Sequence, residues 1–461
     1  MAKARSIFVC GGCGYQSHRW LGRCPDCGEW NTLIEEAPAA APPDVRRRGA
    51  GGATVVAPTP FTLAAVDAHE EERLATGLGE FDRVLGGGLV RGSVVLVGGE
   101  PGIGKSTLLL QTLLGLQQAG VATLLVSGEE SAGQVKLRAR RLTDSPDGLP
   151  LVCETEVEAV VACLEEHSPA VCVVDSVQTL WSSALTSAPG SVSQIREVTG
   201  RLLRVAKEGG TTLVLVGHVT KSGDLAGPRV LEHMVDVVLA FEGDRGQPFR
   251  ILRGSKNRFG ATNEVGVFAM TGRGLEDVPD PSALFLDEAE PTAGSTVVAA
   301  IEGTRCLLAE VQALVAPSAL AMPRRVTRGV EANRLAMVVA VLSRRAGLGL
   351  GECDIFVNVA GGLSLEDPGA DLPVALAVAS AWRDKSVTPG LAAFGELSLT
   401  GQLRYVAQGE KRLLELARRG FERVLVPSRN AEELKARGAV PRGVTLASAH
   451  DIRDVLRGAV G

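Results

Sequence analysis

A glycine-rich run with one lysine joins the apolar segment VVLVGG to the helical segment LLLQTLLGLQQ. Glycines at this spacing let consecutive N–H groups point at phosphate oxygens, and a helix that starts near Lys105 adds its positive N-terminal end. Lys105 would reach the β- and γ-phosphates, and the Ser106 hydroxyl would bind Mg²⁺. The full GxxxxGKS string argues against a purely structural turn. The sequence therefore predicts a phosphate-binding loop for ATP and Mg²⁺, made of Gly99, Glu100, Pro101, Gly102, Ile103, Gly104, Lys105, Ser106 and Thr107.

Carboxylates follow two other apolar runs. Asp175 ends VCVVD, at the carboxyl end of a predicted buried strand, where ligands of open α/β sheets bind. We expect Asp175 to hold Mg²⁺ directly or through a water molecule, with helix capping as the alternative role. Glu129 and Glu130 follow another predicted strand, and we assign the orientation of the attacking water to Glu129. Glu130 stays an alternative base, and both carboxylates could instead favour a helix N-terminus through its dipole.

Four cysteines near the N-terminus have the spacing of a metal site. Cys10 and Cys13 form one CxxC pair, Cys24 and Cys27 form a second, and ten residues separate the pairs. Two such pairs close a four-thiolate shell around Zn²⁺, which would supply folding energy to a module of about thirty residues. Disulfides are disfavoured in a reducing cytoplasm, and His18 is an alternative ligand. Basic and aromatic residues suit contact with nucleic acid or protein, unless the rings only cover the metal: Tyr15, Arg19, Trp20, Arg23 and Trp30.

Alternating strand and helix patterns predict the elements that position these groups. With 461 residues and 45% apolar side chains, the chain is long enough for about three domains. We predict an α/β fold with a four-cysteine module at 1–35, a flexible linker at 36–60, a mostly parallel nucleotide-binding core at 61–285 and a second α/β domain at 289–461. No apolar run reaches the ~18 residues of a membrane span, and no apolar signal region opens the chain. We therefore expect a cytoplasmic protein without membrane contact.

The segment RLATGLGEFDRVLGGGLVRGSVVLVGGEPGIGKSTLLLQ resembles the beginning of RecA-fold ATPases. With the cysteine pairs and the string Lys256-Asn257-Arg258-Phe259-Gly260, it makes the chain outside the linker similar to the RadA (Sms) family of bacterial DNA repair proteins. The resemblance implies a RecA-like motor that forms a hexameric ring on single-stranded DNA, similar to DnaB-type helicases, and drives branch migration during recombination. It also implies that Lys256 and Arg258 stabilise the γ-phosphate charge in the neighbouring subunit's site. Without the family they would be a solvated basic turn.

DNA contacts must come from local basic patches, because the formal net charge is −5. In the RecA fold, the region after Asp175 and the segment GHVTKSGDLAGPRVLEH face the central channel. This likeness implies DNA contact through Arg196, Arg201, Arg204, Lys207, Lys221 and Arg229, with His218 and Thr220 sensing the γ-phosphate. A third basic patch consists of Arg324, Arg325, Arg328 and Arg334. Solvated charge is the alternative in each case. The expected partners are single-stranded and branched DNA and a recombinase or helicase.

The last domain resembles the proteolytic domain of Lon proteases, in which a serine in a short loop pairs with a lysine. Here the loop 365–371 has no serine, and Ser364 lies outside the Lon pattern. Lys411 alone cannot hydrolyse a peptide by that route. We therefore expect a proteolytically inactive platform for oligomerisation and binding. Two alternatives remain for the whole chain: a RecA-fold switch ATPase that binds protein partners, and an ATP-dependent protease.

Overall fold

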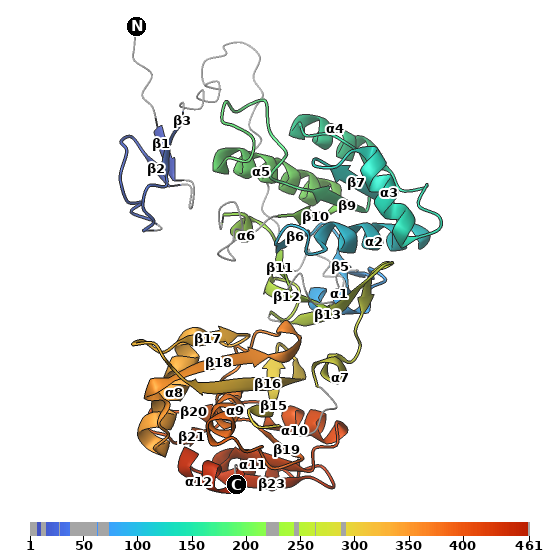
Figure 1. The fold of residues 1–461 in the computed structure, drawn as a ribbon. Helices are drawn as coiled ribbons and strands as arrows, with labels where there is room; N and C mark the ends of the chain where they lie inside the picture. Colours follow the sequence, from blue (N-terminus) through green and yellow to red (C-terminus); the bar gives the residue numbers. More distant parts are fainter. Residues whose placement is uncertain are drawn as a thin grey trace, which may run out of the picture. The chain divides into compact units, whose positions relative to one another are not determined.

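The computed structural model describes residues 7–10, 15–26, 28–36, 62, 73–217, 230–243, 249–262, 264–286 and 292–459. The chain divides into two compact units (Figure 1). The first comprises Met1–Glu242, Leu252–Thr262 and Phe268–Asp277, and the second comprises Gly243–Ile251, Asn263–Val267 and Val278–Gly461. From Val278 onward the chain belongs to the second unit, shortly before the predicted end of the nucleotide-binding core at 285. No helix among the described residues is long and apolar enough to cross a membrane.

The N-terminal segment forms a small antiparallel sheet. β1 (Ile7–Cys10) lies between β2 (Gln16–Ser17) and β3 (Leu33–Glu36). Cys10, Cys24 and Leu33 form its buried cluster, and partly buried Phe8, Tyr15 and Leu21 pack against them. Such a small cluster buries little apolar area, so a metal held by buried thiolates would be the main source of stability.

A mixed sheet carries the predicted phosphate-binding loop. In the described part of the chain its strand order is β14-β13-β12-β11-β6-β10-β9-β7-β8. The strands from β11 to β8 pair in parallel, as the sequence pattern predicts, and β13 and β14 are antiparallel. The strands are β6 (Val94–Gly99), β7 (Thr123–Ser127), β8 (Leu151–Val152), β9 (Val171–Asp175), β10 (Thr212–Val216), β11 (Val237–Glu242), β12 (Phe249–Asn257), β13 (Val265–Thr271) and β14 (Gly274–Asp277).

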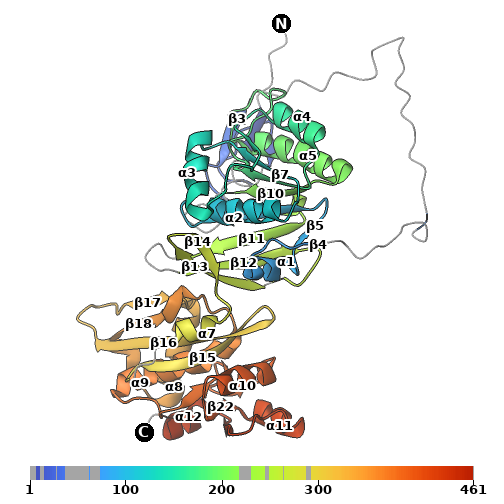
Figure 2. The same ribbon diagram turned by 90° about the vertical axis from the view of Figure 1, so that its right-hand side faces the viewer.

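Helices cover both faces of the parallel part of this sheet (Figures 1 and 2). One buried cluster joins α1, α2 and α3 to Val95 and Val97 of β6, and a second joins α4, α5 and α6 to Val94 and Leu96. Because neighbouring residues of a strand point to opposite faces, both faces of β6 must be apolar. The helices are α1 (Gly79–Leu85), α2 (Lys105–Gln118), α3 (Ala132–Leu142), α4 (Val157–His167), α5 (Val192–Gly209) and α6 (Val230–Met234). β4 (Arg73–Leu74) pairs with β5 (Leu89–Val90).

The second unit is also an α/β domain, as predicted. Its sheet has the order β17-β18-β16-β15-β19-β22-β23 among the described residues, and β20 pairs with β21. The strands are β15 (Ser295–Glu302), β16 (Arg305–Pro317), β17 (Arg325–Arg328), β18 (Cys353–Val359), β19 (Leu391–Ala393), β20 (Glu396–Leu397), β21 (Leu403–Arg404), β22 (Arg423–Pro427) and β23 (Thr445–Ala449). The helices are α7 (Pro281–Phe285), α8 (Ala332–Ala346), α9 (Asp371–Arg383), α10 (Gly409–Arg418), α11 (Ser428–Ala436) and α12 (Ile452–Ala459). Leu413, Leu416 and Leu434 anchor α10 and α11 in the apolar core.

Candidate nucleotide-hydrolysing site

The phosphate-binding loop connects β6 to α2 where the sequence places it. β6 ends at Gly99, and α2 begins at Lys105. Gly104, the residue before the helix, has a φ of 122°, and a Cβ at this position would lie 2.8 Å from Cε of Met270. A side chain would strain this backbone, whereas glycine adopts it readily. The turn thus brings the positive end of the α2 dipole to the carboxyl end of a buried strand.

Lys105 is the buried cation of the loop. Only 3% of its surface is exposed, and Nζ donates hydrogen bonds to the carbonyl oxygens of Gly99 at 2.8 Å and Glu100 at 3.0 Å. Burial lowers the pKa of Lys105, whereas the negative charges of Asp175 and Glu129 act in the opposite direction. The amine therefore interacts electrostatically with both carboxylates that the sequence predicts for Mg²⁺ binding and catalysis. A bound phosphate would replace the loop carbonyls as its partner.

Asp175 and Glu129 lie at neighbouring strand ends. β9 pairs with β7 so that Asp175 is opposite Ser127, and the Gly128 N–H donates to the Asp175 carbonyl at 2.8 Å. The hydroxyl of buried Ser176 donates to Oε1 of Glu129 at 2.5 Å. Ser106 and Asp175 line the same small pocket. Since hydroxyl and carboxylate oxygens suit Mg²⁺, the residues present fit the predicted magnesium site. Sequence reasoning missed Ser176, although its place directly after Asp175 was a usable signal.

Glu130 lines the same small pocket as Ser106 and Asp175, together with its ion-pair partner Arg138. Its carboxylate forms an ion pair with Arg138, and its N–H donates to Oγ of Ser127 at 3.1 Å. The guanidinium neutralises the Glu130 carboxylate and occupies one of its oxygens, which leaves it less able to orient a water molecule. Glu129, which accepts a hydrogen bond from a neutral hydroxyl, is therefore the better candidate for orienting the attacking water.

The basic string 256–260 lies at the other edge of the sheet. β11 runs parallel to β6 with Val237 opposite Val95 and Phe241 opposite Gly99. Arg258 forms an ion pair at 3.0 Å with Asp236, immediately before β11. Nζ of Lys256 donates to the carbonyl oxygen of Val235 at 2.7 Å. The strand β6 is roughly 16 Å long at about 3.3 Å per residue, a distance that neither side chain spans. Lys256 and Arg258 therefore do not reach the phosphate-binding loop of their own chain.

The middle of this string fixes the turn to the rest of the unit. Nδ2 of Asn257 donates to the carbonyl oxygen of Leu85 at 3.2 Å, and its Oδ1 accepts the Phe259 N–H at 2.9 Å. Arg73 donates to the Phe259 carbonyl at 2.6 Å. These bonds tie the turn to the C-terminal end of α1. Sequence reasoning missed Arg73 and Asn257 as supports, because their partners lie far away in the chain.

Half of the predicted zinc ligands lie among the described residues. Cys10 and Cys24 are both buried in the N-terminal module, and the Cys10 thiol donates to Oγ1 of Thr32 at 3.1 Å. Cys13 and Cys27 lie outside the described residues. Buried thiols next to each CxxC turn fit a tetrahedral thiolate site. Trp20 and Trp30 are exposed, and the Arg23 guanidinium lies 5.8 Å from the centre of the Trp30 ring. Both tryptophan rings therefore present much of their surface to solvent.

The predicted DNA contacts divide into three groups. Arg196, Arg204 and Lys207 are exposed on α5, whereas Arg201 forms ion pairs with Glu158 and Glu197. His218, Thr220, Lys221 and Arg229 lie outside the described residues. Arg201 is therefore a poor candidate for DNA contact.

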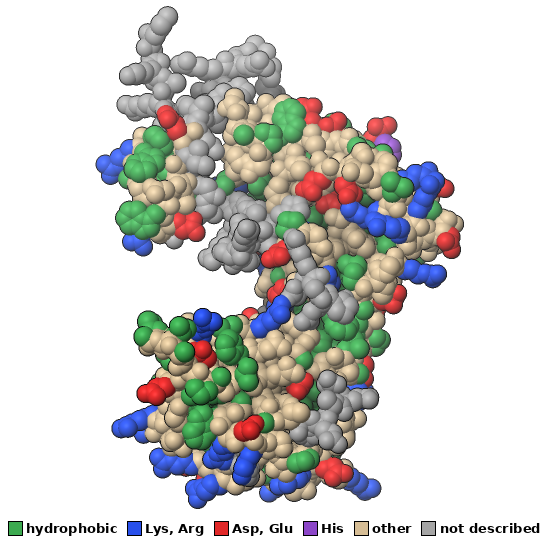
Figure 3. Space-filling view, viewed as in Figure 1, with side chains coloured by type: hydrophobic (Ala, Val, Ile, Leu, Met, Phe, Trp, Pro, Cys, Tyr) green, Lys and Arg blue, Asp and Glu red, His purple; other side chains and the backbone are tan. Residues whose placement is uncertain are grey.

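The basic patch of the second unit is smaller than its sequence suggests. Most lysine and arginine side chains visible on this unit lie at its end near α12, not over β17 (Figure 3). Within the predicted patch, Arg324 and Arg328 are exposed. Arg325 donates to the carbonyl oxygens of Cys353 and Leu350, and Arg334 pairs with Asp371. Arg325 and Arg334 thus have partners within the domain itself, and Arg324 and Arg328 are the better candidates for the predicted DNA contact.

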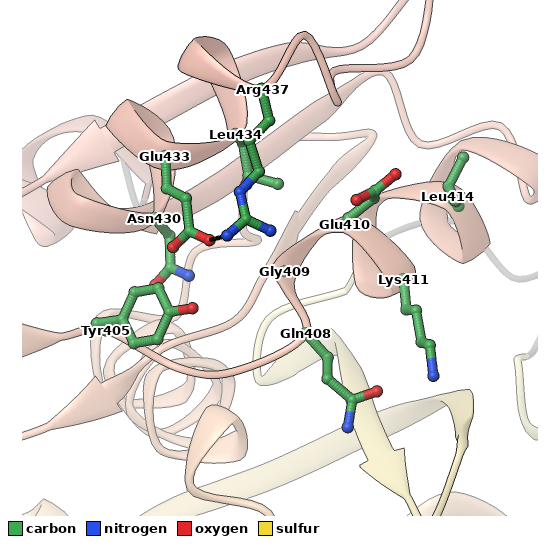
Figure 4. A pocket seen from close by; sticks show the side chains of 10 residues that line it. All are labelled: Tyr405, Gln408, Gly409, Glu410, Lys411, Leu414, Asn430, Glu433, Leu434 and Arg437. Carbon is green, nitrogen blue, oxygen red and sulfur yellow. Dashed lines mark ion pairs between the residues drawn. The ribbon is translucent and has the colours of Figure 1, made fainter.

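The Lon-like loop is closed by a buried ion pair. Asp367 pairs with Arg412 of α10, and a Cβ on Gly369 would lie 2.6 Å from Nη1 of Arg412. Nζ of Lys411 donates to the Thr304 carbonyl at 3.2 Å. Lys411 lines a pocket with Tyr405 and with the ion pair Glu433–Arg437, as Figure 4 shows. The residues that line this pocket include no serine, threonine or cysteine, so the lysine has none of the nucleophiles of a Lon-type protease to activate there.

The fold and these sites define a class of protein, a RecA-like P-loop ATPase with an N-terminal zinc ribbon and a ChlI/Lon-like C-terminal domain. Three families match successive parts of the chain. Residues 8–35 match the rubredoxin metal binding domain, residues 58–224 match an AAA domain, and residues 328–430 match subunit ChlI of Mg-chelatase.

Relatives cover almost the full length of this chain. The DNA repair protein RadA of Bacillus subtilis is 46% identical over 100% of both chains, and that of Pseudomonas aeruginosa is 51% identical over 94% of both. RadA of Escherichia coli K12 is 46% identical over 99% of both. The chain therefore belongs to the RadA family of DNA repair proteins and is an ATP-hydrolysing enzyme. Among solved structures, the RadB recombinase covers 44% of this chain and 99% of its own, at 24% identity and a TM-score of 0.37, too low for an argument.

Proposed function

We propose that this RadA-family ATPase is a DNA-dependent motor that translocates on single-stranded DNA and promotes branch migration of recombination intermediates. It works as a homo-hexamer in the cytoplasm. The observation that carries the proposal is the position of Lys256 and Arg258, at the sheet edge opposite their own phosphate-binding loop. Cations placed there can serve only a nucleotide held by another copy, so hydrolysis needs an assembly. We call Lys256 and Arg258 the trans cations.

Each site combines residues of one chain with the trans cations of the next. Lys105 and the loop N–H groups bind the β- and γ-phosphates, and Ser106 and Asp175 hold Mg²⁺. Glu129 orients the attacking water and takes its proton at a carboxylate oxygen. The trans cations neutralise charge on the departing γ-phosphoryl group, so a ring of sites hydrolyses ATP only when its subunits are correctly apposed.

DNA binds to exposed lysine and arginine side chains. Arg196, Arg204 and Lys207 of α5 form one such group, and Arg324 and Arg328 of the second unit form another. Single-stranded DNA in a channel contacts the first group, and branched DNA contacts the second, without sequence preference. The name DNA repair protein, which the curated relatives carry, supports this substrate class.

The two flanking domains serve contact and assembly. Cys10, Cys13, Cys24 and Cys27 bind Zn²⁺, and the exposed Trp20, Arg23 and Trp30 form the contact face for DNA or for a recombinase or helicase partner. The Lon-like domain is an inactive platform for the ring. The buried pair Asp367–Arg412 and the absence of serine, threonine and cysteine from the described pocket around Lys411 speak against proteolysis.

Steady-state ATP hydrolysis with and without single-stranded DNA tests the proposal. The wild type should be stimulated by DNA, and Lys105→Ala and Lys256→Ala should abolish the stimulation. Loss of a trans cation should lower the stimulated rate by roughly 10³-fold. Lys411→Ala is a matched control, because it removes an exposed lysine outside the site and should keep the wild-type rate.

Two outcomes would reject the motor. A rate that DNA does not change, or full stimulation of Lys256→Ala, would favour a switch ATPase that only binds protein partners. Hydrolysis of casein by the pure protein would establish the protease instead.

A further inference from the structure

Asp236 connects the phosphate-binding strand to a trans cation. It follows α6, precedes β11, and is buried. Its Oδ2 accepts the N–H of Val94, the first residue of β6, at 3.1 Å, and its own N–H donates to the Val94 carbonyl at 2.9 Å. Its Oδ1 accepts a hydrogen bond from Nη1 of Arg258 at 3.0 Å. One end of β6 thus bears the phosphate-binding loop, and its other end is joined through Asp236 to Arg258.

The negative charge of Asp236 is needed for Arg258 rather than for the strand. An amide oxygen at this position could also accept the Val94 N–H, because a backbone donor requires only a lone pair. A guanidinium gains about twice as much from an ionised acceptor as from a neutral one. Asp236 is 8% exposed at its side chain, whereas Arg258 keeps 52% in solvent. The buried carboxylate therefore holds one edge of the guanidinium and leaves much of the side chain accessible to a neighbouring copy.

The second trans cation is attached to the same short segment. Nζ of Lys256 donates to the carbonyl oxygens of Glu232 and Val235, both at 2.7 Å. Burial and the nearby charge of Arg258 lower the pKa of Lys256, and Asp236 and Glu232 counteract them. The segment from Glu232 to Asp236 thus positions both cations.

We propose that Asp236 is a positioning residue that holds Arg258 in the orientation in which it reaches the nucleotide of the neighbouring copy. The inference rests on the trans role of Arg258 in the proposed function. It adds that the cation is fixed to the strand that carries the chain's own phosphate-binding loop, so each subunit links two successive sites through β6.

Mixing two variant proteins shows which function Asp236 supports, the phosphate-binding loop of its own chain or the trans cation. Asp236→Asn alone should lower kcat of DNA-stimulated hydrolysis by about 10- to 100-fold and leave KM for ATP unchanged, since its own loop is intact. Arg258→Ala should lose the trans cation, and Lys105→Ala should lose the phosphate site. An equal mixture of these last two restores complete sites at about one quarter of the interfaces in a random ring.

The expected result is that Asp236→Asn behaves like Arg258→Ala. Its mixture with Lys105→Ala should regain activity, and its mixture with Arg258→Ala should not. If Asp236→Asn instead regained activity with Arg258→Ala and not with Lys105→Ala, Asp236 would support its own phosphate-binding loop. That result would overturn the inference. If Arg258→Ala and Lys105→Ala fail to complement each other, the trans role itself is wrong, and the inference falls with it. The two failures are therefore distinguishable.

Two further variants distinguish a loss of positioning from a loss of folding. Asp236→Glu keeps the negative charge. It should show the same mixing behaviour as Asp236→Asn, with a smaller decrease in kcat. Asp277→Asn is the matched control, because Asp277 also accepts backbone N–H groups, from Gly79 at 2.6 Å and Glu80 at 3.2 Å, but at the start of α1 rather than beside a trans cation. Asp277→Asn should restore activity in mixtures with either Lys105→Ala or Arg258→Ala, because it keeps both the phosphate-binding loop and the trans cations. If Asp277→Asn copies the mixing pattern of Asp236→Asn, the pattern reflects general destabilisation, and the inference is rejected.

Discussion

At the scale of single residues, adjacent carboxylates acquire different chemistry from their neighbours. Glu129 accepts a hydrogen bond from Ser176, whereas Glu130 is paired with Arg138. A carboxylate that accepts a hydrogen bond from a hydroxyl, rather than one paired with a guanidinium, is better placed to take a proton from water in the transition state. The difference arises from the partner side chains, Ser176 on a neighbouring strand end and Arg138 on α3, not from the glutamates themselves.

We expect Glu129→Gln to lower kcat for ATP hydrolysis by about 10²- to 10⁴-fold while nucleotide affinity stays close to wild type. Glu130→Gln is the matched control and should retain most of the activity, since it loses only an ion pair at the start of α3. Single-turnover hydrolysis and fluorescent nucleotide binding measure the two effects. A larger loss in Glu130→Gln than in Glu129→Gln would assign the base to Glu130.

The sequence was sufficient to predict the phosphate-binding loop, because its chemistry depends on contiguous residues. Lys105 begins α2, and Asp175 ends β9, as their patterns indicate. The choice between Glu129 and Glu130 could not be made, because it depends on Ser176 and Arg138. The same limit applies to Asp236, whose ion pair with Arg258 depends on how β11 and β12 lie beside each other.

At the scale of elements, α10 is anchored to the Lon-like loop by one buried ion pair. Asp367 and Arg412 are both buried, and Asp367 also accepts the N–H groups of Ile301 at 2.8 Å and Gly369 at 2.8 Å. The pair thus joins β15, α10 and the turn before α9. A buried carboxylate is costly without its cation, so removal of one partner should affect the whole domain.

Arg412→Met should lower the free energy of unfolding of the second unit by about 3–5 kcal/mol, because it leaves Asp367 buried and unpaired. Arg418→Met is the control, since Arg418 forms an exposed ion pair with Glu415 on the same helix and should cost about 0.5 kcal/mol or less. Urea unfolding, monitored by hydrogen exchange in peptides of α9 and α10, measures the loss of stability in each variant. Equal effects of the two substitutions would refute a stabilising role for the buried pair.

The Asp367–Arg412 ion pair also predicts how the stability of the second unit depends on pH. Burial raises the pKa of Asp367, but the hydrogen bond and charge of Arg412 and the two N–H groups outweigh burial, and the pKa is lowered. A lowered carboxyl pKa stabilises the fold above the unfolded-state value of about 3.9, and this contribution is lost as pH falls through the folded-state value. The stability gap between wild type and Arg412→Met should therefore narrow on acidification below about pH 4. Urea unfolding curves at pH 7 and pH 3 measure this difference in free energy of unfolding. A difference that stays constant between the two pH values would contradict the prediction.

The elements differ in how well sequence patterns predict them. The parallel strands were predictable because each is a short, continuous apolar run, as in β6 and β10. The hairpin of β13 and β14 was missed, because residues such as Met270 and Leu275 pack against the core without a regular alternation. The patch of arginines around 324–334 was overestimated, since spacing does not show that Arg325 and Arg334 turn toward the domain.

At the scale of the whole molecule, binding and hydrolysis of ATP have different requirements. Lys105, Ser106 and Asp175 belong to one chain, so a single copy can bind the nucleotide. The trans cations lie at the far edge of the sheet, where Arg258 pairs with Asp236 and Lys256 donates to the Val235 carbonyl. Under the proposed function, a single copy would lack the charge that stabilises the transition state, so it would bind the nucleotide but hydrolyse it only in an assembly.

We therefore expect the rate of ATP hydrolysis per subunit to fall steeply when the protein is diluted below its assembly range, while nucleotide affinity per subunit stays constant. Mass photometry at each concentration gives the fraction of assembled chains, and the rate should follow this fraction. Lys105→Ala subunits, which bring intact trans cations, should raise the rate of dilute wild-type protein. Hydrolysis at the full rate in solutions that contain only single chains would show that Lys256 and Arg258 are not needed in trans, and it would remove the main argument for a ring.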